Sequence, residues 1–429
     1  MDRSLRSVIV GTFTLRFSTG LTGALLAYYL AELPRHGGPA VDAVVVGLFA
    51  ATFFVAELVL SPPFGLLSDR LGHHRVMEFG PMFGALAVVL TWATTDLVVL
   101  GFTRWLEGSS TAASVPSILG YIAMVTAGDE LLRGRASARF EGATLAGLGG
   151  GLVAAGFFWE VFGRQAFLVN AGLYGVSWAI YRFGVADPAG EAATLRAPHY
   201  GWRRYGALLR SAHVWLLAPT WIAVNAAIGL WTTQSIFQLV SEPRPGFEDQ
   251  LLMGGLDPME ISLGLAVGLV VFFAGLAFWG ERFKTTRRTT IIFYGICGGG
   301  VVAVAGAAVN HSGGTPLLLV GGAVILLAGL FVLAGATPAA LGLLADISEA
   351  FPADRGAIMG LYSVFLAVGQ IGGALVGGLA ADRAGIDGLF GATVALLVVA
   401  LLPLARLRAL EHVVGAGAPE GRVELAEEP

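Results

Sequence analysis

The chain has 429 residues, of which 55% are hydrophobic and only 13% are charged, with a net charge of −4. Soluble domains carry roughly a quarter charged residues, so this composition excludes an ordinary soluble protein. The mean hydropathy of +0.74 indicates a protein that crosses the membrane many times. The single cysteine excludes a disulfide framework and a thiolate metal site.

Apolar segments recur along the whole chain and are separated by short polar breaks. About 20 apolar residues are needed to cross a bilayer as a helix, and this length predicts twelve membrane-spanning helices. No cleavable signal peptide is evident, so we expect the first span to be permanent. The predicted spans are 8–31, 42–64, 77–95, 97–125, 138–162, 165–185, 213–239, 259–280, 289–309, 315–345, 356–380 and 386–407.

The distribution of cationic residues predicts the orientation. If the N-terminus is cytoplasmic, most arginines fall in the inner segments, and few lie outside. Cytoplasmic loops of membrane proteins carry such an excess, so we expect a multi-pass protein of the cytoplasmic (inner) membrane with both termini cytoplasmic. The cationic residues of the predicted outer loops are Arg35, Arg164, Arg244 and Arg383.

One long inner break divides the chain. Residues 186–212 begin as a Pro/Gly/Ala-rich linker and continue as a basic stretch with Trp202 and Tyr205, which is typical of an interfacial helix. We therefore predict an N-terminal six-helix bundle at 1–185 and a C-terminal six-helix bundle with a short cytoplasmic tail at 213–429.

The two halves repeat weakly. The segments 65–75 and 277–287 both end a predicted span with an acidic residue followed by cations, and they align Asp69 with Glu281. The segments 116–123 (PSILGYIA) and 338–345 (PAALGLLA) also match. Such repeats favour two pseudo-symmetric bundles, an arrangement typical of secondary transporters.

Glycine is abundant, with 61 residues. Small residues allow membrane helices to approach closely, so the segments 147–156 (GLGGGLVAAG) and 369–378 (GQIGGALVGG) are predicted helix contact faces.

A charged sequence, GLLSDRLGHHR, ends the second span at 65–75. It resembles the loop signature of the major facilitator superfamily (MFS), which reads roughly G-x-x-x-D-R-x-G-R-R/K. Here Gly72 is followed by His73-His74-Arg75, so histidine stands at the first position of the closing cationic pair. The fourth span also resembles that family, because Arg104 precedes Gly108 by four residues. The proline of the fifth-span antiporter signature is missing, since Leu148 follows Gly147. The resemblance, closest to drug and metabolite exporters, implies an all-α fold of twelve transmembrane helices.

The resemblance also implies a gate at this loop, in which Asp69 holds the bundles together in the outward-facing state. The gate residues are Gly65, Asp69, Arg70, Gly72 and Arg75. The residues themselves predict a tight turn at Gly72 and arginines held at the headgroups. The alternative is a topogenic turn with surface charges alone.

Ionisable residues inside predicted spans are unfavourable in hydrocarbon and are functional candidates by default. Arg16 and Glu57 lie at similar depths and could pair, and Arg104 and Glu107 share one face of the fourth span. Glu141 lies near the inner end of the fifth span, where it is either functional or an interfacial partner of arginines.

The second half lacks these charges. Under the repeat, Leu269, Leu326 and Gly329 occupy the positions of Glu57, Arg104 and Glu107. The scaffold therefore does not require the charges, although a purely structural ion pair is an alternative. The polar candidates of the second half, as substrate contacts or as interhelical hydrogen bonds, are Asn225, Trp231, Gln234, Tyr362 and Gln370.

These patterns predict a secondary active transporter that moves a small organic molecule by alternating access, with proton-coupled export as the main hypothesis. An importer or uniporter on the same fold, or a non-transporting membrane sensor or scaffold, are the alternatives. No nucleotide-binding glycine loop or nucleophile elbow occurs, so we expect no enzyme, no cofactor and no metal. The expected partners are the substrate, protons and membrane lipid but no nucleic acid, and we expect a monomer.

Overall fold

The computed structural model describes residues 3–186, 214–242, 244–283, 285–349 and 355–409, and all regular structure in these ranges is helical. Helical structure occupies most of each of the twelve predicted spans, although short turns interrupt the spans 77–95 and 315–345. The predicted all-α fold is confirmed. The helices are α1 (Arg3–Ala31), α2 (Ala43–Leu71), α3 (His73–Met77), α4 (Phe79–Ala93), α5 (Leu97–Val125), α6 (Glu130–Phe162), α7 (Ala166–Gly184), α9 (Val214–Val240), α10 (Pro258–Arg282), α11 (Arg288–Asn310), α12 (Pro316–Leu333), α13 (Ala336–Glu349) and α14 (Arg355–Ala409), with short 3-10 turns at Leu33–His36 and Gly163–Gln165.

The last two predicted spans both lie in α14. The backbone departs from helical geometry at Ala384 and at Gly385, where φ is +60°. This kink falls between the predicted spans 356–380 and 386–407. Because glycine adopts a positive φ without steric penalty, Gly385 lets the chain change direction there.

Aspartates fix the start of three helices in the first half of the chain. Asp42 accepts a hydrogen bond from Val45 N at 2.8 Å and caps α2. Asp96 caps α5 and Asp129 caps α6 in the same way. A side-chain oxygen at this position satisfies an N–H that has no partner within the helix, so each polar break defines a helix boundary.

Within the described residues, eight helical stretches are long and apolar enough to cross a membrane by themselves. Helix α5 is not among them, although it has 29 residues. It carries Arg104, Glu107 and the hydroxyl run Ser109–Thr111, and it buries all of them. A helix with so polar a buried face needs protein around it rather than lipid.

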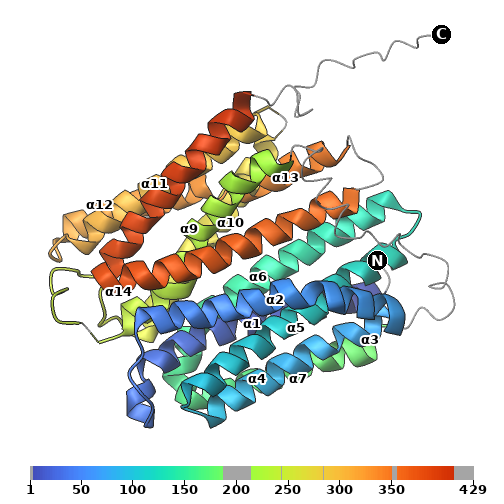
Figure 1. Ribbon diagram of the computed structural model, residues 1–429, viewed down its shortest axis with the longest axis horizontal. Coiled ribbons are helices and arrows are strands. Elements are labelled where there is room, and N and C mark those ends of the chain that lie inside the picture. Colours follow the sequence, from blue (N-terminus) through green and yellow to red (C-terminus); the bar gives the residue numbers. More distant parts are fainter. Residues whose placement is uncertain (1–2, 187–213, 243, 284, 350–354, 410–429) are drawn as a thin grey trace. The chain divides into compact units, whose positions relative to one another are not determined.

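Contacts divide the chain into two compact units. Unit 1 comprises 1–198, 228–269 and 370–389, and within it α1 packs on α6 and α7, α2 on α5, and α4 on both α5 and α7 (Figure 1). Unit 2 comprises 199–227, 270–369 and 390–429, and within it α11 packs on α12 and α13. The boundaries 1–185, 186–212 and 213–429 stay a prediction, and the linker lies outside the described residues except for Ala186.

Glycines on α6 form a helix contact face, as the sequence predicts. A methyl group at Gly147 would lie 2.7 Å from the Phe13 carbonyl oxygen of α1, and one at Gly151 would collide with the Phe17 carbonyl. Farther along, Gly156 lies against the Pro258 carbonyl at the start of α10. Residues 147–156 therefore allow α6 to approach two other helices at backbone distance.

The segment 369–378 also packs at backbone distance. On α14, Gly377 lies against Leu230 of α9, and a methyl group at Gly378 would lie 2.8 Å from the Ala43 carbonyl oxygen of α2. This contact face is also confirmed.

Candidate functional site

Among the described residues, α5 carries the most deeply buried ion pair. Arg104 is 7% exposed and Glu107 is 1% exposed, and Arg104 Nη1 forms an ion pair with Glu107 Oε2. The shared helical face predicted from their spacing of three residues accounts for this pair. The second oxygen, Glu107 Oε1, has no hydrogen-bond partner within the described residues. This buried oxygen can therefore still accept a hydrogen bond or a proton.

Helix α2 covers this ion pair. The guanidinium carbon of Arg104 lies 5.0 Å from the centre of the Phe53 ring, a cation–π contact. One turn away, Gly108 lies directly against the Phe53 carbonyl, which leaves no room for a side chain. The glycine of the fourth-span signature thus brings α2 close enough for its aromatic ring to shield the arginine.

Arg16 on α1 is a second buried cation, with 8% exposure. Its Nη1 donates to Thr111 Oγ1 of α5 at 3.3 Å. Arg16 interacts electrostatically with both Glu57 and Glu141. In the part of the chain that the structure describes, neither carboxylate forms a salt bridge with Arg16.

Buried polar residues on α7 complete the surroundings, and the sequence analysis missed them. Asn170 Nδ2 donates to Thr22 Oγ1 of α1 at 2.8 Å and to the Ser18 carbonyl at 3.1 Å. The Tyr174 hydroxyl lies 3.5 Å from the same Thr22 oxygen, and Tyr174 interacts electrostatically with Glu107. Hydrogen bonds therefore join α7 to α1, and Tyr174 lies within electrostatic range of Glu107.

A sequence signal for this face was available. Asn170, Tyr174, Ser177 and Tyr181 recur at intervals of three and four residues in an otherwise apolar helix, and each is no more than 1% exposed. This spacing places them on one side of α7. A polar stripe at helical period within a membrane span predicts a contact with another polar helix.

The polar candidates of the second half are placed differently. Gln234 is fully buried and its Nε2 donates to the Ala43 carbonyl at 2.8 Å, which joins α9 to α2. Asn225 donates to Trp221 O of its own helix at 2.9 Å. Gln370 is 8% exposed and accepts a hydrogen bond from Thr232 at 3.4 Å. Trp231 is half-buried on α9, and Tyr362 lies on α14 with a side chain outside the described set.

Gln234 therefore acts as an interhelical hydrogen-bonding group, one of the two alternatives for these residues. Contact with substrate stays a prediction for the group as a whole.

The charged loop has the backbone that its glycine predicts. Gly72 has φ +98° between α2 and α3, and its N–H donates to Ser68 O at 3.0 Å. Asp69 and Arg70 are exposed, and Asp69 Oδ1 lies 3.9 Å from Nε2 of the His73 imidazole. Gly65 lies on α2 and Arg75 on α3. The turn geometry is confirmed, and the gate role stays a prediction.

Taken together, the apolar helices and the buried charges define a polytopic helical membrane protein. Residues 8–346 match the profile of the Major Facilitator Superfamily, and the chain belongs to that family. Its helices are consistent with the twelve-helix architecture of the MFS fold.

Two curated relatives are drug-resistance proteins. The Quinolone resistance protein NorA of Staphylococcus aureus (strain MRSA252) is 22% identical over 272 residues, 62% of this chain and 64% of NorA. The Multidrug resistance protein MdtG of Escherichia coli is 29% identical over 113 residues, 26% of this chain and 27% of MdtG. The chain thus aligns with less than two thirds of the length of either relative.

The fold is also similar to that of a solved transporter. The crystal structure of the nucleoside transporter NupG superposes with a TM-score of 0.71 and 13% identity, over 95% of this chain and 99% of NupG. Its D323A mutant superposes with a TM-score of 0.69. At this identity the similarity establishes the fold alone.

Proposed function

We propose that this transporter exports a small organic molecule by alternating access, driven by protons that bind at the Arg104–Glu107 pair. The observation that carries the proposal is the burial of this pair, with Glu107 only 1% exposed and one carboxylate oxygen without a partner among the described residues. Breaking a buried ion pair is unfavourable unless the charge is removed. Protonating Glu107 removes it, releases Arg104 and changes the charge of the site.

The residues around the Arg104–Glu107 pair support a site whose protonation changes during transport. Phe53 covers Arg104, and Tyr174 of α7 interacts electrostatically with Glu107. Glu57 on α2 and Glu141 on α6 lie within the field of Arg16, so a second carboxylate is available to the same cation. The matching positions of the second half are uncharged, which favours a functional origin for the charges.

The export direction is supported by the relatives. NorA is named for quinolone resistance and MdtG for multidrug resistance. We extend this substrate class, small organic drugs, to the present chain. The charge bias of the sequence supports placement in the inner membrane with both termini cytoplasmic, and we propose that the transporter works as a monomer.

Transport in vesicles of controlled orientation tests the proposal. The protein is reconstituted, a quinolone serves as the probe, and accumulation is measured with and without an imposed pH gradient. Accumulation should require the gradient in the parent. The substitution Glu107→Gln should abolish it while sparing exchange of quinolone for quinolone, and Glu57→Gln should have the same effect if that carboxylate carries the proton.

A matched control is Glu160→Gln, since Glu160 is an exposed carboxylate on α6. It should accumulate quinolone as the parent does. Accumulation at the parental level in both Glu57→Gln and Glu107→Gln contradicts proton coupling through these residues. Absence of any protein-dependent quinolone movement contradicts the proposed substrate class.

A second candidate function rests on Arg16. Its guanidinium bonds a threonine hydroxyl rather than a carboxylate in the described structure. An arginine in this setting is suited to an anionic substrate group. Uniport of an organic anion is therefore favoured if transport proves independent of the pH gradient, and Arg16→Gln should then raise KM more than it lowers kcat.

A further inference from the structure

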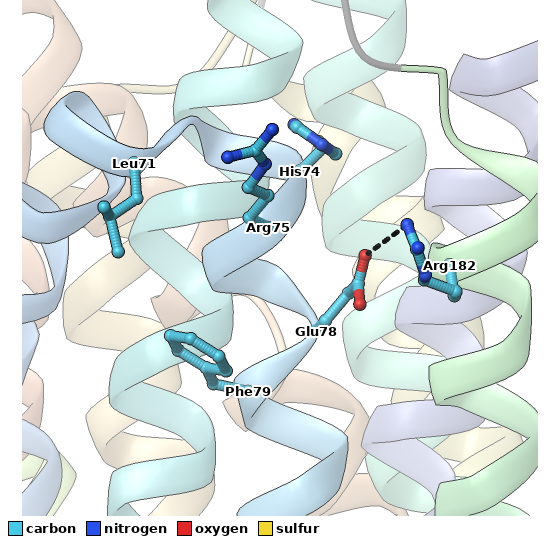
Figure 2. Close-up of a pocket in the computed structure, with 6 residues that line it drawn as sticks. All are labelled: Leu71, His74, Arg75, Glu78, Phe79 and Arg182. Carbon is cyan, nitrogen blue, oxygen red and sulfur yellow. Dashed lines mark ion pairs between the residues drawn. The ribbon is translucent and has the colours of Figure 1, made fainter.

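A cavity of about 620 Å³ lies at the end of unit 1 where α2 gives way to α3 and α4. Figure 2 shows its six lining side chains, which come from α2, the α3–α4 segment and α7. Of its lining residues, only Arg75 belongs to the predicted gate motif, and none belongs to the Arg104–Glu107 ion pair. The lining residues are Leu71, His74, Arg75, Glu78, Phe79 and Arg182.

The polar lining carries more positive than negative charge. Two arginines, Arg75 and Arg182, and a single carboxylate, Glu78, line it. Glu78 Oε1 lies 4.0 Å from Arg182 Nη1 across the gap to α7 (Figure 2). A guanidinium has five N–H donors, so this long contact leaves Arg182 able to bind a second anion.

The two partners of that contact differ in access. The Arg182 side chain is 56% exposed, whereas the Glu78 side chain is 15% exposed. An incoming anion therefore reaches the arginine without displacing the carboxylate. The Glu78 charge opposes such an anion, so its removal should strengthen binding.

The rest of the lining is apolar. Leu71 at the end of α2 is 46% exposed, and Phe79 lies at the start of α4. A cavity with arginines on one side and hydrocarbon on another fits a group that is anionic at one end and apolar at the other. Basic pockets of this kind between membrane helices hold phosphate headgroups, and arginine matches phosphate geometry better than lysine does.

We propose that this cavity is a binding site for a phosphate group, with Arg182 and Arg75 as its cationic contacts and Glu78 as the charge that limits its affinity. The phosphate comes either from an anionic phospholipid or from a soluble phosphate. Leu71 and Phe79 favour the phospholipid. The site is separate from the proposed coupling residues, so it does not depend on the proposed direction of transport or on proton coupling.

Binding is tested by thermal unfolding of the purified protein in a neutral detergent. The midpoint is followed during titration with phosphatidylglycerol, with phosphatidylcholine, and with sodium phosphate. In the parent, phosphatidylglycerol should raise the midpoint more than phosphatidylcholine does. A single arginine near a membrane surface changes the affinity for an anionic lipid about fivefold, so Arg182→Gln should weaken the apparent affinity by about that factor.

Two further variants keep the test decisive. Glu78→Gln should bind the phosphate probe about fivefold more tightly, a gain that general destabilisation does not produce. Arg135→Gln is the matched control, because Arg135 is an exposed arginine of α6 outside the cavity, and it should titrate as the parent does.

A response to phosphatidylglycerol alone assigns the site to a lipid headgroup, and an equal response to sodium phosphate assigns it to a soluble phosphate. Identical titrations of the parent, Arg182→Gln and Glu78→Gln overturn the proposal.

Discussion

The two halves of the chain differ at one matching position, where a helix packs against its neighbour. In the first half, Glu107 of α5 is buried with Arg104 and covered by α2. At the matching position of the second half, Gly329 of α12 lies against α11, where a methyl group would come within 2.8 Å of the Gly298 carbonyl oxygen. One half buries an ion pair, and the other brings two backbones together.

This difference indicates that the fold does not require buried charges at this position. Backbone contact between glycines packs membrane helices without polar groups. A buried ion pair is often no more stabilising than apolar residues of similar volume. Since the second half dispenses with charges at these positions, the comparison supports the role in proton coupling that we propose for Arg104 and Glu107.

The largest loss of stability should come from removing one partner of the Arg104–Glu107 ion pair. Arg104→Leu, which installs the residue of the second half, leaves Glu107 buried without its cation and should destabilise the protein by about 3 kcal/mol. Adding Glu107→Gly should recover most of this loss. Thermal unfolding of the two single variants and the double variant measures the coupling. A double variant less stable than Arg104→Leu alone would show that the scaffold needs the charges.

The second-largest loss of stability should come from disrupting the glycine contact between α11 and α12. Gly298→Ala places a methyl group 2.7 Å from the carbonyl oxygen of Gly329 and from the amide nitrogen of Leu333, neither of which can move easily. We expect a destabilisation of about 2 kcal/mol in thermal unfolding, typical of overpacking. Gly300→Ala on the same helix meets nothing within 4 Å and should be neutral or slightly stabilising. Equal effects of the two substitutions would refute the backbone contact.

The polar contacts between α1 and α7 should have a smaller effect. Asn170→Leu removes the hydrogen bonds to Thr22 and Ser18 and should destabilise the protein by about 1 kcal/mol. Thr14→Val is the control, because the Thr14 hydroxyl donates to the Val10 carbonyl of its own helix, a bond within one helix and not between two. If Thr14→Val lowers the unfolding midpoint as much as Asn170→Leu, these interhelical bonds contribute little.

The smallest effect on stability should come from the charged loop. The Asp69 side chain is 51% exposed, so Asp69→Asn should change the unfolding free energy by about 0.5 kcal/mol or less. If Asp69 acts as a gate, the same variant should shift the protein toward inward-facing states and slow turnover. Cysteine accessibility from each side, measured together with transport, tests this role. Unchanged accessibility with unchanged turnover would rule the gate out.

The sequence by itself determined the helices. Hydrophobic length predicts each span, because a bilayer accepts only segments that bury their own backbone hydrogen bonds. The turn at Gly72 and the contact face at 147–156 were equally readable, because both depend on properties of glycine alone. The pairing of Arg104 with Glu107 followed from helical spacing, which is a local property.

Only the tertiary structure decided which helix each face meets. Helical period places Asn170 and Tyr174 on one side of α7, but it does not say that α1 lies opposite. Arg16 and Glu57 have similar depths, yet Arg16 bonds Thr111 of α5 instead. Gln234 bonds the first residue of α2, nearly two hundred positions earlier in the chain. The cavity beside Arg182 likewise needs three segments that approach only on folding, because contacts between helices depend on side-chain packing across the bundle and not on any period within one helix.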